Sequence, residues 1–291
     1  MESHPLEREA CRREGDANSE PALPDDATAQ AERTSPDTMA VVAAARRRRV
    51  LYLIFALSGL AGLVYEATWT RYLQLFLGHA AYAQVLVLSL FMGGMAVGAL
   101  IAPRLGRATT TPLAAYAAIE ALLGVAALAF HPVFDGVTTY AYETLLPGSQ
   151  GSATATLVQW LIASMLILPQ SILLGMTFPM MSAAVLRLGS DRGGRVFAML
   201  YFVNSAGAVI GVLIAGFLLI EFYGLRATMI AAGLANLAVA AIAAAIARRV
   251  TFAPAVVRGA ATQSVGRWLL VFAFSTGASS FLYEIGWLRM L

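Results

Sequence analysis

The chain has no lysine, a single cysteine and few charged residues of any kind. Charged residues make up 13% of its 291 positions, roughly half their share in ordinary soluble domains, while 59% of the residues are hydrophobic and the mean hydropathy is +0.70. The lone Cys11 excludes a disulfide framework and a cysteine metal site, and the three histidines have no metal-ligand spacing. This composition excludes a conventional water-soluble enzyme and indicates a polytopic membrane protein.

Catalytic and phosphate-binding motifs are also missing from the sequence. It contains no Ser/His/Asp arrangement, no phosphate loop and no Rossmann-type fingerprint, and its Gly93–Gly98 run lies inside an apolar stretch. The arginines beyond residue 49 lie between apolar runs, which is typical of a topology signal and not of a nucleic-acid-binding surface. We therefore expect no catalytic residue, metal or cofactor in this chain, and a lipid bilayer as its first partner.

Composition divides the chain into four segments. Residues 1–45 are rich in Glu, Asp, Arg, Ala and Pro without apolar periodicity, which predicts a disordered tail. Residues 46–249 are predicted to be a six-span transmembrane domain, since a span needs about 20 apolar residues. Its apolar runs lie at 50–77, 82–102, 113–131, 154–186, 196–220 and 227–247. Residues 250–266 are predicted to be a cytoplasmic linker, and 267–291 a seventh span that the chain barely completes.

The placement of arginines predicts the orientation of these spans. Arginines precede the first apolar run (Arg46–Arg49) and recur in the connections after the second, fourth and sixth runs, whereas the other connections are poor in them. The positive-inside rule then puts the N-terminus in the cytoplasm. A signal peptide is the competing interpretation, but the first run is too long for one. Met39 just precedes this cluster, so translation starts at Met1 or at Met39.

A segment of the first span recurs at the end of the chain. Residues 59–73 align with residues 277–291 at an offset of 218 residues without a gap. Six positions coincide: the glycine and leucine at the two ends of the segment, and Tyr65, Glu66, Trp69 and Arg71, which match Tyr283, Glu284, Trp287 and Arg289. Tyr65 and Trp69 share a helix face, and their rings suit the headgroup level. The parallel copies predict an all-α fold of major-facilitator type, namely one six-helix half and the first helix of a second repeat whose remainder is missing.

Three charged side chains are expected at membrane depth, where a charge costs about 2.5–3.5 kcal/mol and usually faces a bundle interior. Glu66 and Arg71 lie about 24 and 31 Å along the first span. They form a ligand-binding or gating cluster, or an ion pair that locks the span to its copy through Glu284 or Arg289. Glu120, the most interior acid, binds a cationic substrate, carries a proton, or makes a hydrogen-bonded helix contact.

Two further spans carry candidate residues for a substrate path. Pro169, Gly175 and Pro179 predict a kinked or broken fourth span next to Gln170, and such breaks line transporter sites or are purely structural. In the fifth span, Asn204 is a site residue or an interhelical hydrogen-bonding residue. The small residues after it, at 207, 211 and 215, favour close helix packing, as does the Gly94-x-x-x-Gly98 pattern of the second span.

Four segments together resemble a known family, bacterial membrane proteins in which a major-facilitator-like domain is fused to a spermidine synthase-like domain. The segments are residues 57–71, 91–98, 173–179 and 201–211. The resemblance implies a downstream aminopropyltransferase-like domain that binds decarboxylated S-adenosylmethionine and a polyamine, with none of its residues in this chain. The membrane module then anchors the enzyme and transports a polyamine or related cation. The alternatives are a stand-alone small-solute transporter of major-facilitator type and a purely structural anchor.

The fusion hypothesis makes a prediction about the coding sequence after codon 291. We expect five further spans and then a soluble domain with a glycine-rich loop, because a six-plus-six repeat requires the rest of its second half. Sequencing the transcript beyond this codon checks the expectation. A stop codon at that point would contradict it.

Overall fold

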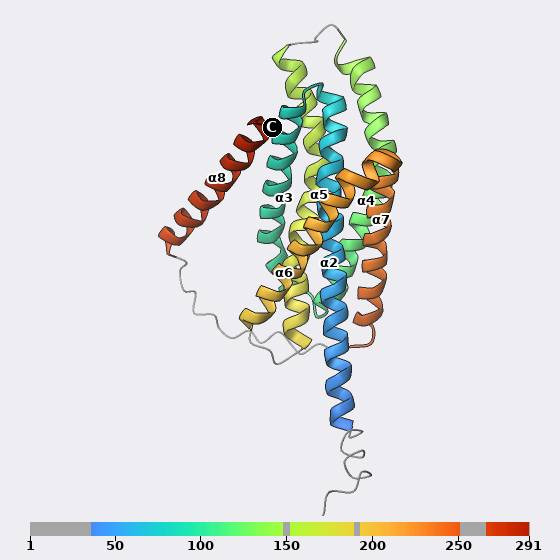
Figure 1. Ribbon diagram of the computed structural model, residues 1–291, viewed down its shortest axis with the longest axis vertical. Coiled ribbons are helices and arrows are strands. Elements are labelled where there is room, and N and C mark those ends of the chain that lie inside the picture. Colours follow the sequence, from blue (N-terminus) through green and yellow to red (C-terminus); the bar gives the residue numbers. More distant parts are fainter. Residues whose placement is uncertain (1–35, 148–151, 189–192, 251–265, 291) are drawn as a thin grey trace, which may run out of the picture. The chain divides into compact units, whose positions relative to one another are not determined.

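The computed structural model describes residues 36–147, 152–188, 193–250 and 266–290, and every regular element within them is helical (Figure 1). The α-helices are α2 (Pro36–Leu77), α3 (Ala80–Ala108), α4 (Pro112–Tyr140), α5 (Ala153–Leu188), α6 (Gly193–Ile214), α7 (Ile220–Ala247) and α8 (Arg267–Met290). Two short π-helical turns, η3 (Ala141–Leu145) and η4 (Ala215–Leu219), follow α4 and α6. The chain divides into two compact units, Met1–Arg46 and Arg47–Leu291.

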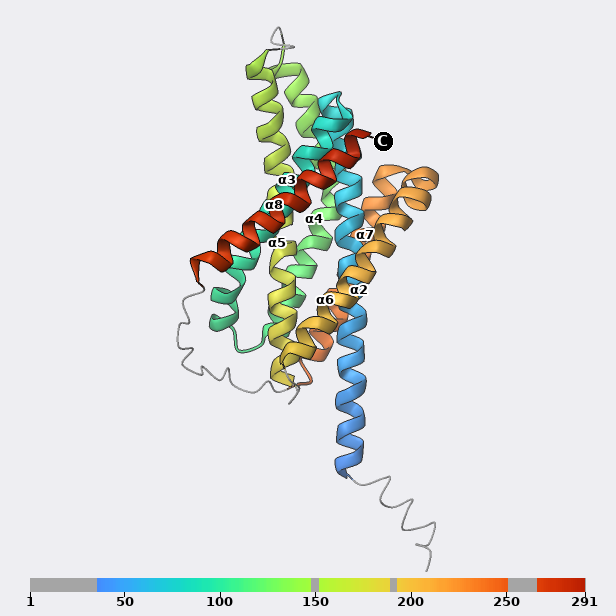
Figure 2. The same ribbon diagram turned by 60° about the vertical axis from the view of Figure 1, so that its left-hand side comes forward.

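Six helices are long and apolar enough to cross a bilayer, so the structure is that of a multi-pass membrane protein. One of the six, Gly193–Ala247, contains α6, η4 and α7. Its helical course is interrupted at Gly224, where φ is 75° and ψ is 174°. A residue with a Cβ rarely adopts this φ, which explains glycine here. Figures 1 and 2 show α6 running in one direction and α7 running back in the other, as the separate runs 196–220 and 227–247 predicted.

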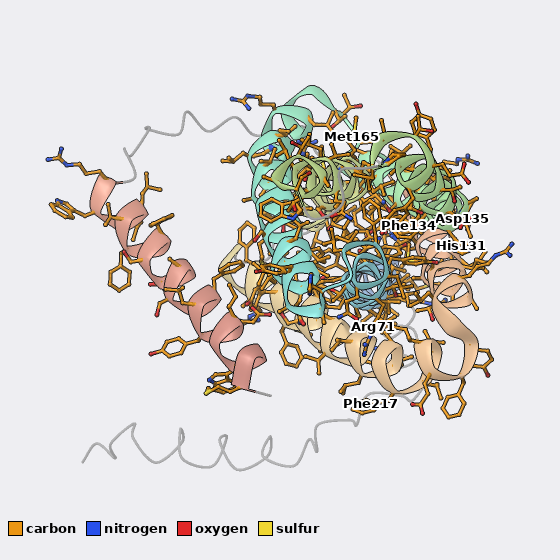
Figure 3. The ribbon with its side chains drawn as sticks, turned by 90° about the horizontal axis from the view of Figure 1, so that it is seen from above. Arg71, His131, Phe134, Asp135, Met165 and Phe217 are labelled. Carbon is orange, nitrogen blue, oxygen red and sulfur yellow. The ribbon has the colours of Figure 1, made fainter. Side chains whose placement is uncertain are left out.

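Helix α2 supplies the centre of the second unit. Seen from above, its residues after Arg46 lie among α3 to α7 (Figure 3). Several of the largest fully buried side chains come from it, among them Leu51, Phe55, Tyr65 and Trp69. No residue of α8 that the structure describes is buried. The core of the second unit is therefore built around α2.

Glycines let the helices of this unit approach backbone to backbone. A Cβ on Gly207 or Gly211 of α6 would collide with the carbonyl oxygens of Ala56 or Leu60 in α2. Helices α3 and α5 meet in the same way, since a Cβ on Gly98 would collide with the carbonyl oxygen of Ile172. The predicted packing role of the small residues in the second and fifth spans is thereby confirmed.

Two boundaries differ from the sequence-based expectations. Residues 36–45 were predicted to be part of a disordered tail, but α2 already begins at Pro36 because the alanine-rich stretch after Met39 is a strong helix former. The rest of that predicted tail, and most of the predicted linker 250–266, lie outside the described residues. Helix α4 continues past the predicted loop start at residue 132 as far as Tyr140, since Phe134 packs on Tyr72 with ring centroids 4.7 Å apart.

The fourth span was predicted to be kinked or broken, and α5 has no break, since it stays helical through both Pro169 and Pro179. A kink stays a prediction. A proline removes only one backbone donor, and neighbouring polar side chains can serve the freed carbonyl groups. Next to Pro169, Gln170 Nε2 and Ser171 Oγ donate to the carbonyl oxygens of Leu166 and Ile167 at 2.9 and 3.1 Å. These are not the freed carbonyl group, since the donor that Pro169 lacks would have served residue 165. Gly175 does not open the helix either, but packs against the backbone of Met95 in α3.

The contact between α6 and α2 predicts that Gly207→Ala destabilises the protein. The new methyl group would overlap the Ala56 carbonyl group, so the helices must separate, at a cost of roughly 1–3 kcal/mol. The measurement is thermal unfolding in detergent. Gly136→Ala is the matched control, since a Cβ at Gly136 of α4 meets nothing within 4 Å. Equal melting temperatures for the two variants would contradict this account of the packing.

Candidate functional site

The carboxyl group of Glu120 is the most deeply buried acid among the described residues. Glu120 lies on the inward face of α4, the face that also carries Tyr116 and Leu123, and its side chain is 0% exposed. Ser58, a buried residue of α2, donates a hydrogen bond of 2.5 Å from its Oγ to Glu120 Oε1. A helix that was amphipathic only for packing would carry an apolar residue at this position, so the carboxyl group requires an explanation of its own.

Several polar atoms around Glu120 lack partners. Its second carboxyl oxygen, Oε2, is buried without a hydrogen bond to any residue that the structure describes, and so are the hydroxyl groups of Tyr65 and Tyr116. Both phenol rings lie within electrostatic range of the carboxyl group. The Tyr116 hydroxyl group approaches Ser58 and Glu120 without reaching good hydrogen-bond geometry. The cluster therefore has hydrogen-bonding capacity that these protein groups do not fill.

Asn236 of α7 lies at the same depth as Glu120. Helices α4 and α7 are antiparallel neighbours that touch at Gly124 and Gly233, where a Cβ on Gly124 would lie 2.8 Å from the Gly233 carbonyl oxygen. Glu120 precedes Gly124 by one turn, and Asn236 follows Gly233 by three residues. Because the helices are antiparallel, Glu120 and Asn236 lie about 6 and 4.5 Å from this glycine contact, toward the same end of the bundle. Asn236 is fully buried, and both its amide nitrogen and its oxygen lack a partner among the described residues.

This set of groups suits a proton or an ammonium ion. No ion pair to Glu120 occurs within the described ranges, and no three metal-ligating side chains gather there. One carboxylate beside hydroxyl groups, with an amide group at the same depth, can accept hydrogen bonds from a cationic N–H donor or hold a proton. We call Ser58, Glu120, Tyr116, Tyr65 and Asn236 the Glu120 cluster.

Glu66 and Arg71 lie apart from the Glu120 cluster. Glu66 is half-buried, two turns beyond Ser58 on α2, and Arg71 is exposed and donates to Gln74 Oε1 at 3.3 Å. Where the structure describes side chains, neither residue pairs with Glu284, which is exposed on α8. The Arg289 side chain lies outside the described residues, so a lock through it stays a prediction.

The two copies of the repeated motif have different surroundings. In α2, Tyr65 and Trp69 stack with ring centroids 5.7 Å apart, and both are fully buried. Their rings thus face the protein interior and not lipid headgroups, because Phe91 and Phe130 pack against Trp69. In α8, Tyr283 and Trp287 are exposed.

Gln170 and Asn204 do not join the Glu120 cluster. Gln170 is buried in α5 and donates to the Leu166 carbonyl oxygen, while its own Oε1 lacks a partner in the described part of the chain. Asn204 is half-buried where α6 crosses α2, so close that a Cβ on Gly59 would lie 2.6 Å from Asn204 Oδ1. Its place in this helix crossing favours the packing interpretation.

Sequence reasoning missed most of the cluster. Tyr116 and Glu120 are four residues apart, which alone places them on one helix face. Asn236 is the single amide side chain in an alanine-rich run, a signal that could have been used. Ser58 shows no signal, because serine is common in membrane helices and only the fold brings it to Glu120.

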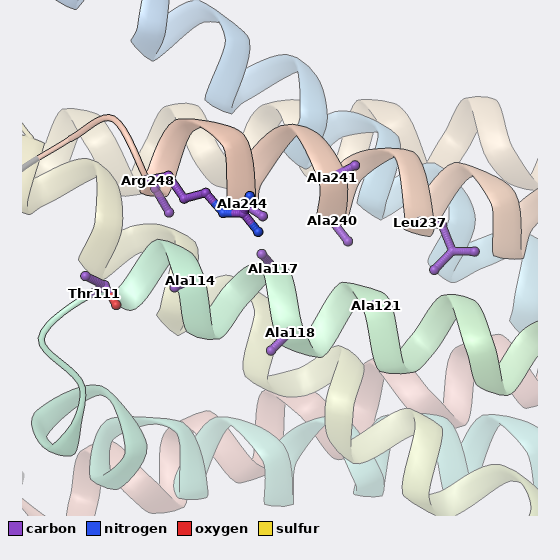
Figure 4. A pocket seen from close by; sticks show the side chains of 11 residues that line it. Thr111, Ala114, Ala117, Ala118, Ala121, Leu237, Ala240, Ala241, Ala244 and Arg248 are labelled. Atoms are coloured by element: carbon purple, nitrogen blue, oxygen red, sulfur yellow. The ribbon is translucent and has the colours of Figure 1, made fainter.

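A groove runs along the line of contact between α4 and α7, which we call the α4/α7 seam, at the end of the bundle that carries Arg248 (Figure 4). It has a volume of about 680 Å³, and alanines from both helices make up most of its wall. Ala117 and Ala121 flank Glu120 in the sequence and line this groove.

The structure thus defines an all-helical membrane protein with a buried carboxyl cluster. Comparisons with protein-family models, with curated proteins and with solved structures found no match.

The bond between Ser58 and Glu120 predicts that Ser58→Ala lowers stability. The substitution leaves a buried carboxyl oxygen without a donor, at a cost of about 1–3 kcal/mol, so the detergent-solubilised variant should unfold at a lower temperature. Ser89→Ala is the control, because exposed Ser89 bonds only to the Val85 carbonyl oxygen of its own helix. A Ser58→Ala melt that matches the Ser89→Ala melt would show that the bond contributes nothing.

Proposed function

We propose that this chain is a membrane-embedded module that binds and moves a small cation, with the Glu120 carboxyl group as the cation-binding group. The observation that carries the proposal is the unpaired Oε2 of a fully buried acid. An ionisable group inside a membrane protein is costly, and it usually lies on an ion or substrate path.

The surroundings of Glu120 support cation binding over a purely structural bond. A structural hydrogen bond between α2 and α4 needs one donor and one acceptor, which Ser58 and Glu120 Oε1 already supply. The extra polar atoms of Tyr65, Tyr116 and Asn236 add cost without adding a bond between helices. A bound cation would use the carboxylate, the Asn236 oxygen and the phenol oxygens together.

The resemblance to synthase-fused membrane proteins suggests a polyamine as the cation. A polyamine carries several ammonium groups, each a charge-assisted donor to a carboxylate. In this proposal the module is of major-facilitator type and anchors a synthase-like domain, with Glu120 on the substrate path. A stand-alone transporter of another cation would use the same residue, whereas a pure anchor would not need it.

The end of the bundle that carries Arg187 is proposed to face the cytoplasm. Arg187 of α5 donates to the carbonyl oxygens of Gly106 and Thr109 at 3.1 and 3.2 Å, so the connections after α3 and α5 lie at one end. The arginines that follow α7, Arg248 and Arg249, extend the same pattern. This gathering supports the orientation that the positive-inside rule predicts.

Replacing Glu120 with Gln should weaken cation binding and slow transport. The amide keeps the shape and can still bond to Ser58, but it carries no negative charge, so a polyamine should bind at least about tenfold more weakly. The measurements are uptake of labelled spermidine into vesicles that contain the full chain, and binding of spermidine to the solubilised protein.

Glu143→Gln is the matched control, because Glu143 is an exposed acid on η3. If wild-type protein binds and transports spermidine and Glu120→Gln does so equally well, the role of Glu120 is wrong. If the wild type shows neither binding nor transport of spermidine, the polyamine assignment is wrong. In that case, a proton flux that is the same in the wild type and in Glu120→Gln would favour a purely structural membrane anchor.

A further inference from the structure

A second cavity lies on the α4/α7 seam, away from the Glu120 cluster. It has a volume of about 290 Å³, and its wall combines apolar groups with three ionisable side chains. His131 and Asp135 come from α4, one turn apart, and Arg226 comes from α7. Figure 3 shows His131 and Asp135 together on the same side of the bundle. We call this cavity the Asp135 cleft.

The charged groups of the Asp135 cleft do not pair with one another in the part of the chain that the structure describes. Although Asp135 and Arg226 line the same cleft from facing helices, no ion pair joins them in the structure as described. Both side chains are exposed. A hydrogen bond to Tyr72 of α2 orients the His131 ring, since His131 Nδ1 lies 2.9 Å from the Tyr72 hydroxyl oxygen. The cleft therefore presents an anionic acceptor, Asp135, and a permanently charged cation, Arg226. The bond to Tyr72 occupies Nδ1 of His131, which leaves Nε2 of the imidazole for a ligand.

The depth of the cleft matches that of lipid headgroups. Asp135 follows Pro112, the first residue of α4, by 23 residues, or about 35 Å of helix. The hydrocarbon core of a bilayer is about 30 Å thick, so Asp135 lies just beyond it. Arg226 lies at the same end, two residues after the Gly224 interruption. This end is opposite the one that carries Arg248.

Apolar side chains continue from the cleft toward the middle of the membrane. Ile230 forms part of its wall, and Leu234 follows one turn further along α7 with its side chain exposed. On α4, Val125 beside the seam is likewise exposed. A ligand with a charged head and apolar tails could thus lie along the seam, with its tails against these residues, whereas a free polar solute would make no use of them.

We propose that the Asp135 cleft binds the headgroup of a zwitterionic phospholipid with a primary ammonium group, namely a phosphatidylethanolamine. Arg226 and His131 bind the phosphate, and Asp135 accepts hydrogen bonds from the ammonium group. A choline headgroup has no N–H donor, so Asp135 selects the primary ammonium group over it. This site is distinct from the Glu120 cluster, and the proposal stands or fails independently of cation transport.

Short-chain lipids test the selectivity of the cleft. Dioctanoyl-phosphatidylethanolamine and its phosphatidylcholine and phosphatidylglycerol counterparts are titrated into the solubilised full chain, and their dissociation constants are measured. We expect the wild type to bind the ethanolamine lipid at least about tenfold more tightly than the choline lipid. Asp135→Asn should remove this preference, because the amide is uncharged. Arg226→Gln should weaken binding of all three lipids, since all carry the phosphate.

Glu143→Gln serves as the control, since it removes an exposed acid of η3 that does not line the cleft. Equal affinities of the wild type for the ethanolamine and choline lipids would overturn the proposal, as would a preference that survives Asp135→Asn. Free phosphoethanolamine is the last probe. If it competes as well as the lipid binds, the cleft recognises a soluble zwitterion, and the assignment to a lipid is wrong.

Discussion

The rest of this structure depends on how a carboxyl group is accommodated between apolar helices. Glu120 is fully buried and has no cationic partner among the described residues, so its environment must come from the helices that touch α4. Ser58 of α2 supplies the one donor, and α7 brings the amide group of Asn236 to the same depth. Such an arrangement needs the three helices to be held in a fixed register, because a shift of one residue turns a helix by about 100°.

Glycine contacts provide that register. Gly207 and Gly211 let α6 press on the backbone of α2 next to Ser58, and Gly124 meets Gly233 one turn from Glu120. Backbone contacts of this kind tolerate little sliding, since a larger neighbour would collide at once. The small residues that the sequence showed as packing stripes are therefore also what aligns the polar residues. In this bundle the packing role and the positioning role cannot be separated.

The hydropathy pattern predicted the helices well, because a span is a property of some twenty consecutive residues. Even the reversal at Gly224 falls between two predicted spans. The surroundings of single side chains were harder to predict. The Tyr65/Trp69 pair looked suited to the membrane interface, yet it is buried, since the partners that cover it come from α3 and α4. The prolines of α5 suggested a kink or a break, but the helix runs on through both prolines and packs closely on α3 at Gly175. Such outcomes depend on residues distant in the sequence, which a local pattern does not contain.

The seam between α4 and α7 combines these features along one line. It begins in the alanine-walled groove at Arg248, passes Glu120 and Asn236, closes where Gly124 meets Gly233, and opens again in the Asp135 cleft. A cation bound at Glu120 would be sealed from the cleft, because the two glycine backbones are in contact. Movement along this seam requires α4 and α7 to separate there. Separation would cost the close backbone contact between Gly124 and Gly233, because small residues that let backbones approach are what holds membrane helices together. The small residues that close the seam therefore also set the cost of opening it.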